Sequence, residues 1–191
     1  MRFVVGLGNP SERYRRTRHN VGFMVVDALV ARAGVGKGHE EALAQVAGAR
    51  LFGEEPLLLV KPLTFMNRSG AAVDRLLADH AGGPQDLLVV VDDVALELGR
   101  LRVRERGSHG GHNGLRSIIE ALGSEEFARV RVGIRKGDVA GDLAEYVLDA
   151  FPPEDVLVVR EAVERAADAV ECVLREGTVV AMNRFNGAAP A

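Results

Sequence analysis

Three runs of consecutive apolar residues, each ending in turn-forming or polar residues, occur in the first half of the chain. They cover residues 3–5, 57–60 and 87–91. Continuous apolar runs of this length are typical of strands buried on both faces of a parallel sheet. The pattern therefore predicts three core strands, and the carboxyl ends of parallel strands meet at one edge of the sheet.

Alternating positions predict further strands. Residues 42–52 alternate weakly and lead through a hairpin turn at 53–56 into the strand at 57–60, while residues 130–134 form another short apolar run. In residues 99–106 the arginines at even positions alternate with Leu101 and Val103. We interpret that segment as an edge strand with a cationic row on one face.

Helical spacing of apolar residues predicts helices between and after these strands. One begins at His19 or Asn20 and ends before Gly34, and the next carries Val73, Leu76 and Leu77 with Thr64 as its N-cap. Four more are expected at 115–122, 142–148, from 152 to Gly177 and onward to about 185, after which the tail is expected to fray. Strands separated by helices indicate an α/β fold.

The composition limits the class of protein. A chain of 191 residues that is 47% hydrophobic can fill one well-packed core, so we expect a single domain over residues 1–191. The formal charge of −3 is uneven, because residues 1–37 and 99–136 are basic and residues 137–177 are mainly acidic. This distribution favours a polyanionic partner. The lone Cys172 and the lack of a signal or membrane-span pattern predict a soluble cytoplasmic protein.

Polar residues gather where the predicted core strands end. Asn9 and His19 follow the first strand, Asn67 the second and Asp92 the third. The loop at 107–114 adds four glycines around His109, His112 and Asn113, a composition suited to close approach of the backbone to a ligand. We predict one convergent site at this edge of the sheet.

Two alternatives fit parts of this pattern. Gly6-x-Gly8 resembles the start of a dinucleotide-binding fingerprint, but Ser11 stands where the third glycine belongs and Pro10 disfavours an immediate helix. His109-x-x-His112 is a possible metal pair, completed by Asp92 or His19, although the intervening glycines do not hold two imidazoles on one rigid face.

Hydrolysis with water as the nucleophile agrees best with these side chains. A histidine beside an aspartate is a general base near neutral pH. No serine or cysteine lies in a nucleophile elbow, whereas several asparagines could hold a peptide or stabilise an oxyanion. Together with the arginines, this set predicts hydrolysis of an ester attached to a polyanion.

Several longer motifs, in order along almost the whole chain, resemble the bacterial-type peptidyl-tRNA hydrolase family. They are Val5-Gly-Leu-Gly-Asn-Pro with Tyr14 and Thr17-Arg-His-Asn-Val-Gly22, Lys61-Pro-Leu-Thr-Phe-Met-Asn-Arg-Ser-Gly70, Asp92-Asp93 with Leu96-Glu-Leu-Gly99, and Gly107-Ser-His-Gly-Gly-His-Asn-Gly-Leu115. The resemblance implies a twisted, mixed and mostly parallel sheet flanked by helices. It also implies a monomer without metal or cofactor that hydrolyses the ester joining a peptide to the 3′ end of tRNA and so recycles the tRNA.

The resemblance also implies roles for individual residues. His19 matches the catalytic base, Asp92 the residue that stabilises its reactive form, and Asn9 the residue that distinguishes N-blocked from free aminoacyl esters. Positions that match contacts to the tRNA 3′ end or the peptide are Tyr14, Phe65, Met66, Asn67 and Asn113, and those that match phosphate-binding residues are Arg104 and Arg131, assisted by Arg135 and Lys136.

The mechanism expected from this set is attack by a water that His19 deprotonates, with Asn67 as the first choice to stabilise the oxyanion. Two alternatives are a non-catalytic RNA-binding protein of the same fold, as in a chloroplast splicing factor, and a metal-dependent hydrolase that uses His109 and His112.

Overall fold

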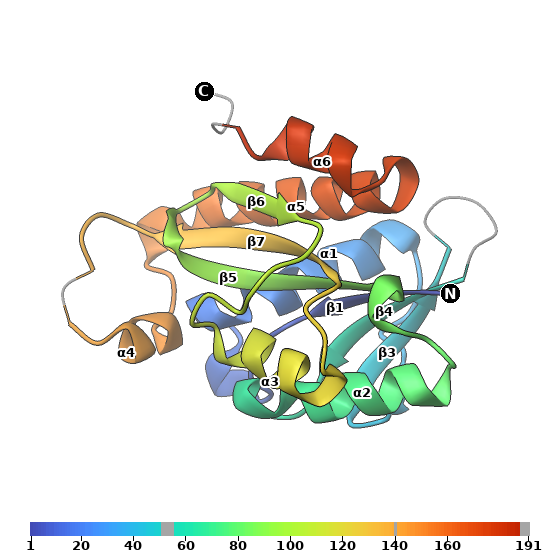
Figure 1. The fold of residues 1–191 in the computed structure, drawn as a ribbon. Helices are drawn as coiled ribbons and strands as arrows, with labels where there is room; N and C mark the ends of the chain where they lie inside the picture. The colour runs from blue at the N-terminus through green and yellow to red at the C-terminus, as the bar shows by residue number, and fades with distance from the viewer. Residues whose placement is uncertain (51–55, 140, 188–191) are drawn as a thin grey trace.

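A computed structural model describes residues 1–50, 56–139 and 141–187, and its centre is a seven-stranded mixed sheet (Figure 1). The strand order is β2-β3-β4-β1-β5-β7-β6. The strand bounds are β1 Arg2–Gly6, β2 His39–Glu41, β3 Ala44–Ala49, β4 Leu57–Pro62, β5 Leu87–Glu97, β6 Leu101–Arg104 and β7 Ala128–Arg135.

The four central strands β4, β1, β5 and β7 are parallel, and β3, β2 and β6 pair antiparallel at the edges. The three predicted core strands are confirmed, and their carboxyl ends lie at one edge of the sheet. The prediction that the third strand ends at Asp92 was wrong. Asp92 and Asp93 still pair with Val132 and Gly133 of β7, and the strand continues through an irregularity to Glu97.

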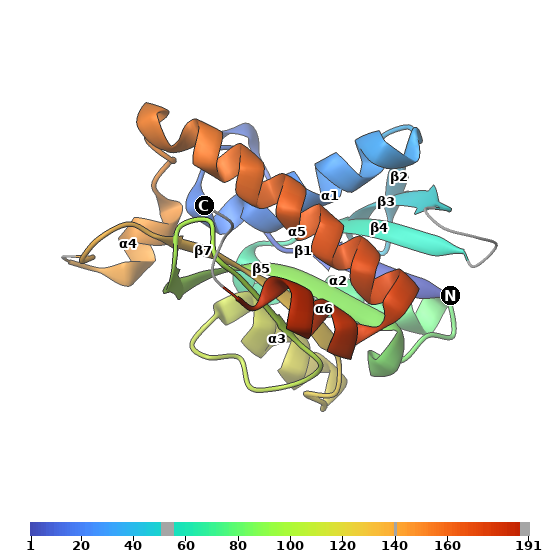
Figure 2. The same ribbon diagram turned by 90° about the horizontal axis from the view of Figure 1, so that it is seen from above.

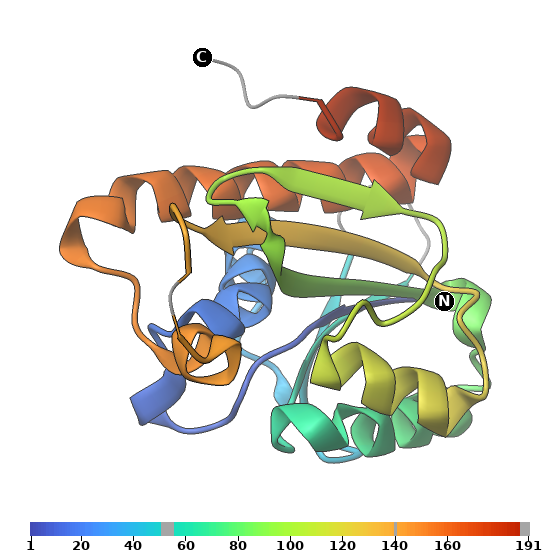
Figure 3. The same ribbon diagram turned by 60° about the vertical axis from the view of Figure 1, so that its left-hand side comes forward.

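Helices cover both faces of the sheet (Figures 2 and 3). One face carries α1 (Val21–Ala33), α5 (Val156–Glu176) and α6 (Thr178–Phe185), and the other carries α2 (Ser69–Asp79) and α3 (Asn113–Leu122). The short helix α4 (Leu143–Leu148) lies beyond the carboxyl ends of β5 and β7. The 3₁₀ segments are η1 Glu12–Tyr14, η2 Arg18–Asn20, η3 Met66–Arg68, η4 Pro84–Asp86 and η5 Pro153–Asp155.

Alternate residues of each central strand enter two separate apolar clusters. Val4 and Val90 pack with α1 and α5, while Val5 and Val89 pack with α2 and α3. All four are fully buried. This explains the uninterrupted apolar runs in the sequence, because a strand with helices on both faces needs apolar residues at every position.

Two local predictions need comment. Thr64 does not cap α2, because η3 intervenes and the helix begins only at Ser69. The Thr64 hydroxyl is buried and has no hydrogen-bond partner among the described residues. The predicted hairpin joins β3 to β4 as expected, but residues 51–55, which include positions 53–55 of the turn predicted at 53–56, lie outside the described residues. The end of the tail, 188–191, also lies outside them.

Among the described residues, none of the helices combines the length and the apolar character needed to cross a bilayer.

Candidate active site

His19 and Asp92 meet at the carboxyl edge of the sheet. Nδ1 of His19, in η2, lies 2.8 Å from Oδ1 of Asp92 in β5, and both side chains are buried. A carboxylate at this position accepts the Nδ1–H, which leaves the Nε2 lone pair of His19 free to take a proton. The pair therefore has the geometry of an oriented general base.

The placement of His19 depends on a close approach between β1 and α1. A Cβ atom on Gly6 would lie 2.1 Å from the carbonyl oxygen of Gly22, and one on Gly22 would lie 2.5 Å from the backbone nitrogen of Leu7. Both glycines are needed for this backbone contact. They bring the start of α1, and η2 before it, against the end of β1. The Gly6-x-Gly8 motif thus serves packing between a strand and a helix.

A second histidine shares Asp92. Nε2 of His112 lies 2.9 Å from the same Oδ1 atom, and the two imidazole rings are 5.1 Å apart between centroids. Burial alone would raise the pKa of Asp92, but the electrostatic interaction and hydrogen bond with His112, followed by those with His19, hold it well below its usual range. Asp92 is therefore a carboxylate at neutral pH and accepts from both rings.

The cavity around this cluster has a volume of about 230 Å³. It is lined by residues of η2, β5, the glycine-rich loop with the start of α3, β7 and α4: His19, Asp92, Asp93, Val94, Gly110, Gly111, His112, Asn113, Arg131, Leu143, Ala144 and Val147. The structure therefore brings four of the predicted site residues together, namely His19, Asp92, Asn113 and Arg131.

Arg18 fastens α4 over the cavity. It is buried, its NH1 donates to the carbonyls of Tyr146, Asp149 and Ala150, each at 3.3 Å, and its guanidinium carbon lies 4.1 Å from the centroid of the Tyr146 ring. An antiparallel bridge between Thr17 and Ala150 supports the same connection. The residue before His19 thus holds the helix that covers His19.

Asn9 faces a neighbouring cavity of about 610 Å³, which Phe23, Asp27 and Lys61 also line. Its side-chain Oδ1 accepts the backbone N–H of Met66 at 2.8 Å. Asn20 holds the backbone of Asn9 from both sides, since its Oδ1 accepts the Asn9 N–H and its Nδ2 donates to the Asn9 carbonyl. The amide of Asn9 is therefore held in one orientation.

Of the remaining predicted substrate contacts, Asn113 lines the cavity around His19, whereas Tyr14, Phe65, Met66 and Asn67 line neither of the two cavities. Met66 is buried, Tyr14 is half-buried, and Phe65, Asn67 and Asn113 are exposed. Phe65 and Asn67 lie at or next to η3, which packs against α3, the helix that begins at Asn113. Two amides and an exposed aromatic ring thus lie on adjoining segments.

The two predicted phosphate-binding arginines lie in different environments. Nε of Arg131 lies 2.9 Å from Oδ2 of Asp93, and both side chains are largely buried. Arg104 is exposed and pairs in register with Arg129 at the start of β7, three residues from the position opposite Asp92. At about 3.3 Å per residue, Arg104 is displaced by about 10 Å along the strands from the edge where His19 and Asp92 meet.

The cationic row is confirmed only in part. β6 is an edge strand with the predicted burial of Leu101 and Val103, but it spans four residues, and Arg100 and Arg106 flank it beside Glu97 and Glu126. Arg135 is half-buried at the end of β7. Lys136 bonds Asp155 at 2.5 Å.

A buried arginine supports the glycine-rich loop. Arg129 is 1% exposed and donates to the carbonyls of Gly107, Ser108, Glu125 and Phe127. Burial, followed by repulsion from the neighbouring Arg131, lowers its pKa to about 10, so it remains a cation at neutral pH. The sequence did not predict this role of Arg129. It shows that an arginine lies in the strand, but it does not show which carbonyls the side chain contacts.

The hydrogen bonds at the cluster do not suit a metal ion. One ligand atom each from His19, Asp92 and His112 lies within 4.8 Å of the others, the one such group found in the described part of the chain. However, Oδ1 of Asp92 already accepts from both rings. His109 lies outside the group, and its Nδ1 accepts the N–H of Gly111 at 3.0 Å, so the suggested His109–His112 pair does not form.

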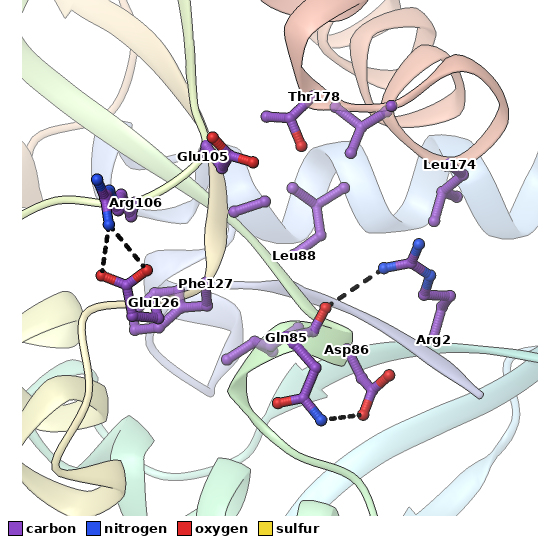
Figure 4. A pocket seen from close by; sticks show the side chains of 14 residues that line it. Arg2, Gln85, Asp86, Leu88, Glu105, Arg106, Glu126, Phe127, Leu174 and Thr178 are labelled. Carbon is purple, nitrogen blue, oxygen red and sulfur yellow. Dashed lines mark hydrogen bonds and ion pairs between the residues drawn. The ribbon is translucent and has the colours of Figure 1, made fainter.

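A cavity of about 560 Å³ lies at the opposite end of the strands, beside residues that begin β1, β5 and β7 (Figure 4). Arg106 pairs with Glu126 there at 3.3 Å, and Arg2 donates to the carbonyl of Gln85. No histidine is among the described residues that line this cavity.

Comparison with known proteins identifies close relatives. The family model described as peptidyl-tRNA hydrolase matches residues 3–191. The chain is 51% identical over its whole length to a peptidyl-tRNA hydrolase of Roseiflexus castenholzii, covering 89% of that protein, and 48% identical to one of Chloroflexus aurantiacus, covering 97% of this chain and 99% of that one. The crystal structure of peptidyl-tRNA hydrolase from Acinetobacter baumannii superposes with a TM-score of 0.91 at 30% identity, covering 100% of this chain and 97% of that one.

Proposed function

Since the chain belongs to the peptidyl-tRNA hydrolase family and hydrolyses peptidyl-tRNA, we propose that His19 is the base that activates the attacking water. The single observation that carries this proposal is the 2.8 Å contact between Nδ1 of His19 and the buried carboxylate of Asp92. It orients the ring so that the free Nε2 atom can accept a proton from water.

The reaction follows from this arrangement. Nε2 of His19 takes a proton from water while the water oxygen forms a bond to the ester carbonyl carbon. The tetrahedral intermediate then breaks its bond to the ribose oxygen of the terminal nucleotide, and the protonated His19 returns its proton to that oxygen. The products are the peptide acid and the tRNA with a free hydroxyl, and no group on the protein is consumed.

Asn9 selects for a blocked amino group. Its Oδ1 faces the Met66 N–H, so its NH₂ group is the part available to a ligand. That donor suits the carbonyl oxygen of a peptide or N-acyl bond, whereas a free α-ammonium group is itself a donor and finds no acceptor there. Asn113 is an exposed amide that lines the cavity around His19, and Asn67 is an exposed amide in η3, which packs against the helix that begins at Asn113. They are the donors we assign to the oxyanion and to the tRNA end, with Asn67 the first choice for the oxyanion.

The other substrate contacts follow the same logic. The exposed ring of Phe65 suits stacking on a base of the single-stranded tRNA end, and we assign Tyr14 and the buried Met66, which follows Phe65 in the chain, to the same end of the substrate. Arg104, displaced toward the far end of β6, suits a phosphate of the double-stranded stem. Arg131, which forms an ion pair with Asp93 in the lining of the cavity, is the second arginine that we assign to phosphate binding. We propose that one domain over residues 1–191 does this as a cytoplasmic monomer without a metal or cofactor.

The test is the rate of tRNA release from N-acetyl-aminoacyl-tRNA and from the unblocked aminoacyl-tRNA, measured in the presence of a chelator. His19→Ala should lower the rate for the blocked ester by about 10²–10⁴-fold, the range for loss of a general base, without weakening tRNA binding. His109→Ala is the matched control and should retain activity, because the His109 ring accepts the backbone N–H of Gly111 in its own loop, and the bond from Arg131 goes to the His109 backbone carbonyl, which the substitution retains.

Two results would contradict the proposal. Loss of activity in chelator would indicate a metal-dependent hydrolase. Binding of tRNA without cleavage by the unmodified protein would indicate a non-catalytic RNA-binding protein.

A further inference from the structure

His112 lies between the catalytic aspartate and the start of a helix. Its Nε2 lies 2.9 Å from Oδ1 of Asp92, and its Nδ1 accepts the backbone N–H of Leu115 at 3.2 Å, which makes it the N-cap of α3. A ring nitrogen that accepts an N–H carries no proton, so the proton of the neutral ring is on Nε2. The helix start thereby fixes the tautomer of His112.

We propose that His112 is a positioning residue for the hydrolysis, because α3 fixes its Nε2–H toward the same carboxylate oxygen that orients His19. This inference rests on the proposed role of His19 as the base. The glycine-rich loop then has two roles: it contacts the substrate, and it places His112 against Asp92.

The sharing of one oxygen has an electrostatic consequence. The carboxylate of Asp92 distributes its charge over two N–H donors, so it stabilises a protonated His19 less than an unshared carboxylate would. His112 therefore helps to keep His19 in the unprotonated form that can accept a proton from water.

The other charged groups around His19 are directed elsewhere. On β5 and β7, Asp93 and Arg131 pair with each other across the cavity. On the segment of His19 itself, Arg18 points to the carbonyls of residues 146, 149 and 150, and α4 presents Leu143, Ala144 and Val147 to the cavity. Within the described residues, His112 is the titratable group that shares the aspartate with His19.

Two substitutions separate the two bonds of His112. Asparagine places an oxygen near the position of Nδ1, so His112→Asn retains a cap for α3 but loses the donor to Asp92. Glutamine places its NH₂ near the position of Nε2, so His112→Gln retains a donor for Asp92 but loses the cap.

The measurement is the pH profile of kcat/KM for N-acetyl-aminoacyl-tRNA. We expect His112→Asn to move the acidic limb upward by about 0.5–1 pH unit, because the unshared carboxylate stabilises protonated His19. His112→Gln should leave that limb near its original position and instead lower Tm by about 2–4 °C through loss of the cap. A purely structural role predicts a Tm change in both variants without a shift of the limb.

Acidic limbs that coincide for His112→Asn and the unmodified protein, or that move equally in both variants, would overturn the inference. If either variant fails to fold, the tautomer of His112 in the unmodified protein tests the inference instead. The ¹⁵N spectrum of the unmodified protein should show His112 protonated on Nε2 and unprotonated on Nδ1, and the opposite tautomer would also overturn it. This measurement needs no activity, so failure of the proposed function, seen as full activity of His19→Ala, is recognised separately.

Discussion

The backbone N–H of Met66 donates to Oδ1 of Asn9 at 2.8 Å, which turns the amide so that its NH₂ group is left for the substrate. The bond joins the loop after β1 to η3, the segment after β4. Two loops that each carry predicted substrate contacts are thus held together by the side chain that we assign to substrate selection.

Asn9→Asp should reduce discrimination between blocked and free esters. The aspartate retains an acceptor for Met66 but replaces the NH₂ donor by a second carboxylate oxygen, which repels a peptide carbonyl and attracts a free ammonium group. We expect the ratio of kcat/KM for N-acetyl-aminoacyl-tRNA over aminoacyl-tRNA to fall by about 10²-fold or more. Single-turnover release of tRNA from both esters measures this ratio.

The matched control is Asn67→Asp, which places the same charge on an exposed side chain next to Met66. It should lower the rates for both esters together and leave their ratio within a few-fold. Equal changes of the ratio in the two variants would show that charge alone, and not the orientation of the Asn9 amide, determines selectivity.

Arg18→Lys should loosen α4 over the catalytic cavity. The lysine retains the charge but loses the planar group that contacts the Tyr146 ring and the three carbonyls. We expect the free energy of unfolding to fall by about 1–3 kcal/mol and KM to rise more than kcat falls. Amide hydrogen exchange should accelerate in residues 143–151, which is the direct measurement.

Arg16→Lys is the control for this substitution, because Arg16 is exposed two residues away in the same segment and keeps its backbone bond to Phe151. It should leave exchange in 143–151 unchanged. Unchanged exchange in the Arg18 variant would mean that the backbone bonds between residues 16–18 and 149–151 hold α4 without the Arg18 side chain.

The sequence predicted the elements whose signals are local. Each core strand was visible because both faces of the sheet are covered, so that Val4 and Val5, or Val89 and Val90, enter different apolar clusters. The convergence of His19 and Asp92 followed from the topology rule for parallel strands, and the structure brings them within 2.8 Å.

What the sequence did not reveal depends on contacts between distant residues. In the sequence, Arg131 is a basic residue of the type that binds phosphate. Only the fold shows that it forms an ion pair with Asp93. The sequence alone does not distinguish the roles of His109 and His112. In the structure, His112 is the N-cap of α3 and its ring contacts Asp92. The helix was predicted to begin at residue 115, whereas α3 begins at Asn113, so the sequence did not indicate that His112 is the N-cap.

Acid should remove a stability contribution of Asp92. The pKa of Asp92 is lowered in the folded protein, so its carboxylate stabilises the fold above the unfolded-state pKa of about 3.9, and this contribution is lost as pH falls toward the folded value. The difference in free energy of unfolding between the unmodified protein and Asp92→Asn should therefore narrow by more than about 1 kcal/mol between pH 5 and pH 2.5. Urea unfolding at several pH values measures it, with Asp86→Asn as the control at a half-buried aspartate. A difference that stays constant with pH would contradict the lowered pKa.

Arg104→Ala should weaken tRNA binding without impairing the chemical step. Arg104 is exposed at the end of β6 and lies about 10 Å along the strands from the catalytic edge, so it can reach a phosphate but not the ester. Loss of one phosphate contact should lower the slope of log Kd against log salt by about 0.9, while single-turnover cleavage at saturating protein stays unchanged. Arg106→Ala is the matched control, because Glu126 already neutralises that guanidinium at 3.3 Å. An equal change of slope in both variants would mean that the overall charge of this edge, and not a contact of Arg104, binds the tRNA.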